Sequence, residues 1–94
     1  MRVQFVERQN GPERLLCEAE IVFDEDGPLS GMKLVGISIW QGTETETITF
    51  PARSFGVGGE RRFFDFLRAV QPGTTEPKRV KDWILSEWRA AKAA

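Results

Sequence analysis

The sequence contains no histidine and no tyrosine, and it has one cysteine, Cys17, among its 94 residues. A single cysteine cannot form an intramolecular disulfide, and without histidine only carboxylates are left to hold a metal, which excludes a structural zinc site. The missing histidine also removes the usual general base near neutral pH and rules out Ser-His-Asp and Cys-His triads. We therefore expect a protein that is not an enzyme and that carries neither a metal nor a cofactor.

Long hydrophobic runs are missing as well. No stretch approaches the roughly 18 consecutive apolar residues that span a membrane, and the first ten residues mix charged and apolar side chains. We therefore expect a cytoplasmic protein without membrane contact. A chain of 94 residues, 40% hydrophobic and 29% charged, supports one modest core, so residues 1–94 are expected to form a single domain.

Net charge is small, at −1, but it is unevenly distributed. Residues 1–50 carry four basic and nine acidic side chains, whereas residues 51–94 carry nine basic and five acidic ones. Such an asymmetry indicates either an anionic partner for the basic half or two halves that face and neutralise each other within the fold.

Apolar side chains alternate with polar ones through most of the first half. Every odd position from 15 to 23 is apolar, which predicts a half-buried strand, and Val3 and Phe5 indicate an earlier strand that precedes a turn at 10–12. The Thr-rich alternation at 43–50 predicts a further strand with one solvated face.

Between these strands, residues 29–40 are apolar on both faces. Val35, Ile37 and Ile39 share one parity, and Leu34 and Trp40 share the other. A strand that is apolar on both faces is typical of the interior of a sheet, so this stretch is predicted to be a central strand.

The second half predicts a loop, a short segment and a helix. Residues 50–60 contain Pro51 and several glycines and are predicted to be a loop, and residues 61–70 fit either a last strand or the start of a helix. Thr75 is a suitable N-cap for a final amphipathic helix whose apolar positions, 80, 83, 84, 88 and 91, recur at helical spacing. The predicted fold is α+β, a four- to five-stranded antiparallel sheet with a C-terminal amphipathic helix packed on it.

Two clusters of basic residues are the candidate binding sites. The first surrounds the glycines of the predicted loop, and arginine forks pair well with phosphate oxygens. The second lies in the first turns of the helix, where cations oppose the helix dipole unless an anion lies against them. A solvated helix face is the alternative for the second cluster. The six candidates are Arg53, Arg61, Arg62, Lys78, Arg79 and Lys81.

Phe63, Phe64 and Phe66 lie beside the first basic cluster. Aromatic side chains interleaved with basic ones can stack the bases of a single strand. Because so short a chain needs its aromatic side chains inside, we expect these three to pack in the core.

The layout resembles that of the SpoVG family of bacterial septation proteins. The order AEIVF, GMKLVGISIW, TITFPARS, a glycine-bearing loop with Glu60-Arg61 and a final KRVKDWILSEW helix is similar to that family from about Val3 to Trp88. The resemblance implies a dimer formed through the sheet that binds DNA or RNA and regulates gene expression, in septation and sporulation, without catalysis or cofactor. The family's contacts would fall here on Arg53, Arg61, Arg62, Lys78 and Arg79.

Two functions are therefore expected from different classes. One is a non-enzymatic nucleic-acid-binding regulator that contacts the phosphate backbone through a basic surface. The alternative is a protein-interaction module that docks a partner on a sheet edge or on the acidic loop at 24–26. A homodimer is expected in either case, because exposed sheet edges pair readily and the core is small.

Overall fold

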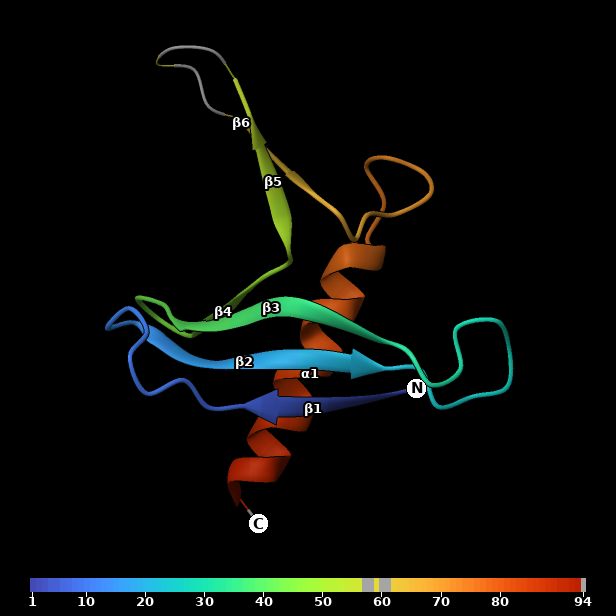
Figure 1. Ribbon diagram of the computed structural model, residues 1–94. Helices are drawn as coiled ribbons and strands as arrows, with labels where there is room; N and C mark the ends of the chain where they lie inside the picture. Colours follow the sequence, from blue (N-terminus) through green and yellow to red (C-terminus); the bar gives the residue numbers. More distant parts are fainter. Residues whose placement is uncertain (57–58, 60–61, 94) are drawn as a thin grey trace.

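A computed structural model describes residues 1–56, 59 and 62–93 of the protein (Figure 1). A four-stranded antiparallel sheet has the order β1-β2-β3-β4, a two-stranded antiparallel sheet is formed by β5 and β6, and one helix crosses the strands on one face of the larger sheet. The predicted α+β fold with a C-terminal helix packed on the sheet is confirmed. The elements are β1 (Arg2–Val6), β2 (Leu15–Val22), β3 (Lys33–Gln41), β4 (Glu46–Thr49), β5 (Ala52–Phe55), β6 (Arg62–Asp65) and α1 (Glu76–Ala93).

The core lies between the four-stranded sheet and α1. The odd positions of β2 point inward as the alternation predicted, and they include the buried thiol of Cys17. Burial keeps water away from that thiol and raises its pKa. The buried set is Cys17, Ala19, Ile21, Ile37, Ile39, Ile48, Phe50, Ile84 and Trp88.

Helix α1 begins as its sequence predicts. The backbone N–H of Arg79 donates to the carbonyl of Thr75 at 3.1 Å, which places Thr75 at the N-cap. Ile84 and Trp88 are buried and Trp83 packs partly against the core, whereas Ala91, predicted on the same stripe, is exposed because the helix extends past the sheet. No helix in the described ranges is long and apolar enough to cross a membrane.

The predicted grouping of Val35 with Ile37 on one face of β3 is wrong. The pairing of β3 with β2 contains a β-bulge just before Ile37, where Gly36 has a φ of +92°. The extra residue leaves Val35 exposed and places Leu34 on the core face, opposite Ile21. A bulge changes the parity of a strand, so a strict period of two assigns the residues before it to the wrong face.

The open face of the large sheet is held by polar contacts between strands. Glu20 on β2 accepts hydrogen bonds from Gln4 on β1 at 2.6 Å and from Lys33 on β3 at 3.0 Å. These two donors stabilise the ionised form and lower the pKa of the Glu20 carboxyl. Trp40 donates from its indole N–H to the Thr49 hydroxyl at 2.8 Å, so the same face is tied from β1 to β4.

Strands β5 and β6 form an arm that stands away from the sheet and the helix (Figure 1). We call residues 52–55 together with 62–65 the arm. The prediction of a loop over residues 50–60 is wrong at β5, and the predicted last strand is present as β6, though in a separate sheet. The radius of gyration is 14.6 Å, whereas a compact domain of this length would have about 12 Å. The arm therefore extends the molecule.

The foot of the arm is fixed to the body at Pro51. The Phe66 N–H donates to the Pro51 carbonyl at 2.8 Å, which closes the base of the arm. On the other side Pro51 packs on Gly36 so closely that a Cβ there would lie 3.0 Å from the Cβ of Pro51. Because Gly36 has no side chain, Pro51 can pack against the β3 bulge at the point where the chain leaves the body and enters the arm.

Candidate nucleic-acid interface

One face of the arm alternates arginine with phenylalanine. In the β5–β6 pairing Arg53 lies opposite Phe64, and Phe55 lies opposite Arg62. Residues directly opposite each other in an antiparallel pair project to the same side, and so do residues two apart along a strand. The four side chains therefore share one face, on which each arginine has a phenylalanine both across from it and beside it. We call these four residues the arginine–phenylalanine face.

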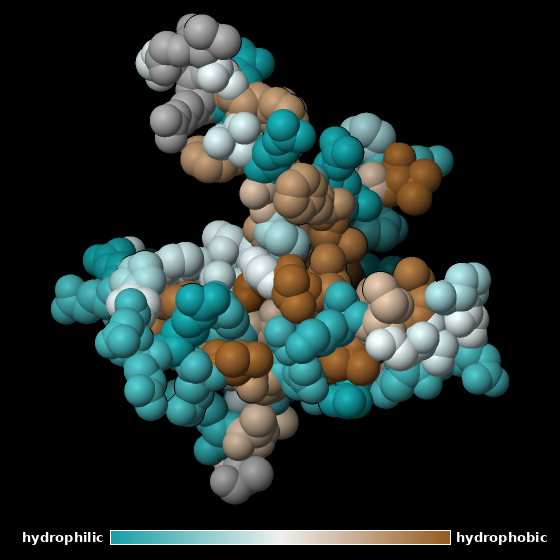
Figure 2. Space-filling model, in the orientation of Figure 1, coloured by the Kyte–Doolittle hydropathy of each residue, from teal (hydrophilic) through white to brown (hydrophobic). Residues whose placement is uncertain are grey.

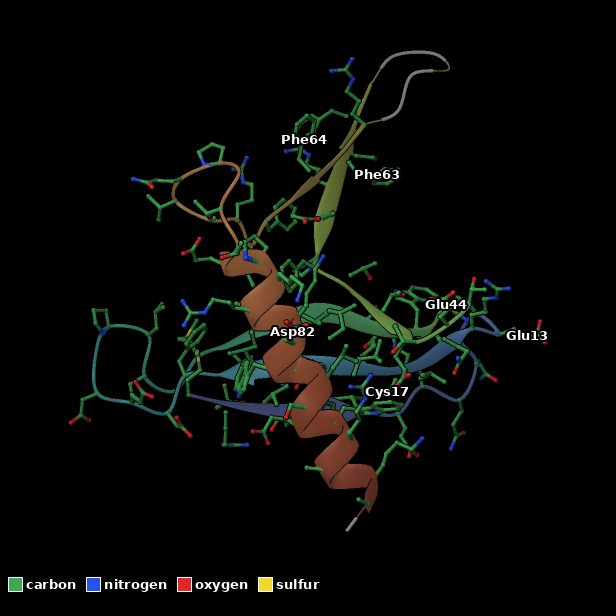
Figure 3. The ribbon with its side chains drawn as sticks, turned by 180° about the vertical axis from the view of Figure 1, so that it is seen from behind. Glu13, Cys17, Glu44, Phe63, Phe64 and Asp82 are labelled. Atoms are coloured by element: carbon green, nitrogen blue, oxygen red, sulfur yellow. The ribbon has the colours of Figure 1, made fainter. Side chains whose placement is uncertain are left out.

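The opposite face of the arm has a different composition. Ala52 pairs with Asp65 and Ser54 pairs with Phe63, so residues 52–55 and 62–65 place no arginine on this side. Figure 3 shows Phe63 and Phe64 pointing to opposite sides of the ribbon. Two neighbouring phenylalanines of β6 thus have different surroundings although both face solvent.

The phenylalanines of this region are exposed. The exposed fractions are 47% for Phe55, 72% for Phe63, 45% for Phe64 and 64% for Phe66. The expectation that Phe63, Phe64 and Phe66 pack in the core is therefore wrong, because the arm stands off the sheet and nothing in the described chain covers them. Figure 2 shows apolar and hydrophilic side chains side by side on the arm.

Contacts within the arginine–phenylalanine face hold its side chains together. The Arg53 guanidinium carbon lies 4.7 Å from the centre of the Phe55 ring, within cation–π distance. The rings of Phe55 and Phe64 meet edge to face, with centroids 5.3 Å apart and an angle of 71° between their planes. Among the described carboxylates none lies within ion-pair distance of Arg53 or Arg62. Neither cation is therefore neutralised by an acid in the part of the chain that the structure describes.

Arg68 extends this face toward the helix, and it was not among the candidates found in the sequence. A groove of about 410 Å³ is lined by Arg53, Phe55, Phe64, Asp65, Phe66 and Arg68. Asp65, Phe66 and Arg68 also line a second hollow of about 630 Å³ that reaches Pro77 in the first turn of α1. Arg68 follows the last strand in an irregular segment, so neither strand parity nor helical spacing linked it to Arg53.

The three basic residues at the start of α1 do not form one patch. At about 100° per residue, Arg79 projects some 160° away from Lys81 around the helix axis. Lys78 forms an ion pair with Asp82 at 2.9 Å, and Lys81 is half-buried with its ammonium 5.0 Å from the centre of the Phe50 ring. Lys81 therefore contributes to packing against the core, which its assignment to the solvated side of the helix did not predict.

Arg79 is exposed beside Glu76. A hydrogen bond from Thr74, with the nearby Arg79 cation contributing, lowers the pKa of the Glu76 carboxyl. The carboxylate is therefore ionised at neutral pH and offsets part of the charge of Arg79.

The remaining sequence candidate, Arg61, lies outside the described residues. Of the six candidates, the structure brings Arg53 and Arg62 together on one face and distributes the three helix residues around α1.

The two oppositely charged halves of the chain are joined by few contacts between charges in the part that the structure describes. In the described ranges one ion pair joins them, between Arg89 and Glu46 at 3.4 Å. Other acids of the first half pair with cations of the same half, such as Glu18 with Arg8 at 3.2 Å and Asp24 with the terminal amine of Met1 at 2.6 Å. None of these described ion pairs involves Arg53 or Arg62 of the arm.

Comparisons of the chain with family models, with curated proteins and with solved structures gave no match. The site is therefore interpreted from its own chemistry.

Proposed function

We propose that this protein is a non-enzymatic nucleic-acid-binding regulator that contacts the phosphate backbone of DNA or RNA through the arm. The arginine–phenylalanine face carries the proposal, because Arg53 and Arg62 lie on one exposed side, and no described carboxylate pairs with either. Arginine forks match phosphate oxygens in geometry and charge. Arg68 lengthens the cationic track from the arm toward the helix.

The protein-interaction alternative has less support. Its acidic loop contains Asp24 and Glu25, and both carboxylates contact the terminal amine of Met1 at 2.6 Å. Hydrogen bonding to that amine lowers the pKa of the Asp24 carboxyl, so this part of the loop is engaged within the chain. A basic partner would have to displace these contacts.

Self-association through the sheet belongs to the proposal. Strands β1 and β4 are the edges of the large sheet, and edge strands present unpaired backbone groups to a second strand. A dimer would present two copies of the arm to one nucleic acid. A strictly monomeric mass by light scattering at micromolar concentration would contradict this part of the proposal. We also propose, from the order of its motifs between about Val3 and Trp88, that the chain is a distant member of the SpoVG family.

The experiment is a titration of labelled oligonucleotides, followed by fluorescence anisotropy at about 50 and 200 mM salt. Neutralised phosphates release counterions, so affinity should fall steeply with salt. The double variant Arg53→Ala/Arg62→Ala should bind more weakly and reduce the logarithmic salt slope by about 0.7–0.9 for each lost phosphate contact.

Arg8→Ala/Arg14→Ala is the matched control, because it removes the same charge from the exposed surface of the first half. This variant should keep the salt slope of the unmodified protein. Absence of binding at the lower salt would overturn the proposed function. Equal loss in both double variants would show that overall charge, and not the arm, determines the affinity.

A further inference from the structure

The exposed phenylalanines of the arm call for a physical explanation that phosphate binding does not supply. Phe50 is buried in the core and Phe5 and Phe23 are half-buried, whereas Phe55 and Phe64 remain about half exposed on the arm. Leaving apolar surface in water is unfavourable in proportion to its area. A small domain that exposes aromatic rings beside arginines, which no described carboxylate pairs with, is therefore expected to cover those rings when a ligand binds.

The geometry of the face fits flat aromatic ligands. The Phe55 and Phe64 rings meet edge to face, with centroids 5.3 Å apart, and Arg53 lies 4.7 Å from the Phe55 ring centre. Rings arranged in this way stay in place without support from the core, and the guanidinium adds a planar cation that can also stack. The groove they line, about 410 Å³ in volume, continues past Phe66 to Arg68.

We infer that the arm binds single-stranded nucleic acid, with bases stacked on Phe55 and Phe64 and phosphates held by Arg53, Arg62 and Arg68. The inference rests on the proposed function and specifies its ligand. In a duplex the bases are paired and stacked on each other, so rings on the surface of the protein meet sugars, phosphates and base edges but not the flat faces of the bases. A single strand leaves its bases free to stack on aromatic side chains while its backbone follows the cations.

Charge favours this occupant over a second copy of the chain. A second arm would bring the same arginines against Arg53 and Arg62, whereas Asp65 is the one described acid that lines the groove. A polyanion with flat apolar groups neutralises the arginines and covers the phenylalanines at the same time. Deoxyribose and ribose strands share this chemistry, so both are included in the test, and tight binding of either supports the inference.

The test compares three kinds of labelled ligand of about 12 nucleotides: a single strand, its duplex, and an abasic strand with the same phosphates and no bases. Each is prepared with deoxyribose and with ribose. The single strand should bind most tightly. Phe64→Ala should weaken single-strand binding roughly 5- to 150-fold, which is the value of one stacked base. The same variant should leave binding of the abasic strand unchanged, because that strand has no base to stack.

Phe63→Ala is the matched control. Phe63 is the neighbouring residue of β6 and is more exposed than Phe64, but it lies on the opposite face of the arm. This variant should bind the single strand as the unmodified protein does. Because both side chains are exposed, both variants should fold, and circular dichroism checks that they have.

The outcomes separate this inference from the proposed function. Equal, salt-dependent binding of the three ligands would overturn base stacking and leave phosphate binding intact. Absence of binding to all three would overturn both. A Phe64→Ala variant that changes the mass in light scattering and not the affinity for single strands would make the arm a self-association surface, which also overturns the inference.

Discussion

The sheet–helix body and the arm use the same residue types for opposite purposes. The body buries Phe50 and Trp88 and pairs Glu20 with Lys33 across two strands, whereas the arm leaves Phe55 and Phe64 in solvent and Arg53 without a described carboxylate partner. Stability comes from the first arrangement, because burial and satisfied polar groups favour the folded state. The arrangement in the arm adds little to the stability of the folded state, but it offers a ligand both a cation and an apolar ring.

Truncation in the body should produce the largest effect. Ile37 is completely buried beneath α1. Ile37→Ala removes buried methyl groups and leaves a cavity, so the free energy of unfolding should fall by about 2–5 kcal/mol. Urea denaturation followed by tryptophan fluorescence measures this change. A loss below about 1 kcal/mol would mean that the sheet–helix core does not dominate stability, and the contrast between body and arm would fail.

The next largest effect is expected where the body meets the foot of the arm. Gly36 has a φ of +92° and lies against Pro51. In Gly36→Ala the free energy of unfolding should fall by about 1–2 kcal/mol, because alanine is strained in the left-handed conformation. It should fall further because the added Cβ clashes with Pro51.

Gly31→Ala separates the two causes, because Gly31 has a φ of +85° and nothing within 4 Å of an added Cβ. In the same denaturation experiment, the free energy of unfolding of Gly31→Ala should fall only by the amount due to the left-handed conformation. If the two variants unfold at the same urea concentration, the contact between Gly36 and Pro51 does not matter for stability.

Acidification should destabilise the body through Glu20. Gln4 and Lys33 lower the pKa of this carboxyl in the folded state, so its contribution is present above the unfolded pKa and is lost as the pH falls through the folded pKa. The urea concentration at the midpoint of unfolding should therefore decrease as the pH is lowered from about 5 to about 3. Glu20→Gln should show a shallower decline.

Glu13→Gln is the control for this pH dependence, because Glu13 is exposed in the loop before β2 and forms none of the ion pairs found in the described chain. Its decline with pH should match that of the unmodified protein. Identical curves for the two variants would show that Glu20 does not connect the strands in solution.

The smallest effect is expected in the arm. Phe63→Ala removes a large apolar side chain that is 72% exposed, so the free energy of unfolding should change by less than about 0.5 kcal/mol. Calorimetry of this variant beside Ile37→Ala measures the contrast directly. A substantial destabilisation by Phe63→Ala would mean that the arm is part of the cooperative unit.

Local sequence patterns predicted most helices and strands of the fold, but they did not predict the β-bulge in β3 or the strand β5. The odd positions of β2 and the N-cap at Thr75 were predictable, because alternation and capping act between near neighbours in the chain. The bulge at Gly36 was not predicted, because a glycine within a strand does not by itself show that the strand contains an extra residue. Strand β5 was missed because the pattern of Pro51 and the later glycines is that of a loop, although the residues between them pair with β6.

The candidate site was predicted in part. Arg53 and Arg62 share one face because β5 pairs with β6, and the sequence had already placed both residues in one basic cluster around the glycines. The half-buried position of Lys81 was not predicted, because helical spacing places a side chain on a face of the helix and does not show how far a neighbouring strand extends beneath it. Phe50 reaches this lysine from β4's end, a contact between residues 31 positions apart in the sequence.

By itself the sequence determined the α+β composition, the strands of the body, the start of the helix and the excess of positive charge in the second half. These depend on periodicity and on residue chemistry that can be counted along the chain. Only the tertiary structure decided that the phenylalanines of the arm are uncovered and that arginines lie among them on one side. Periodicity states which side chains share a face, but whether another element covers that face depends on where the rest of the chain packs.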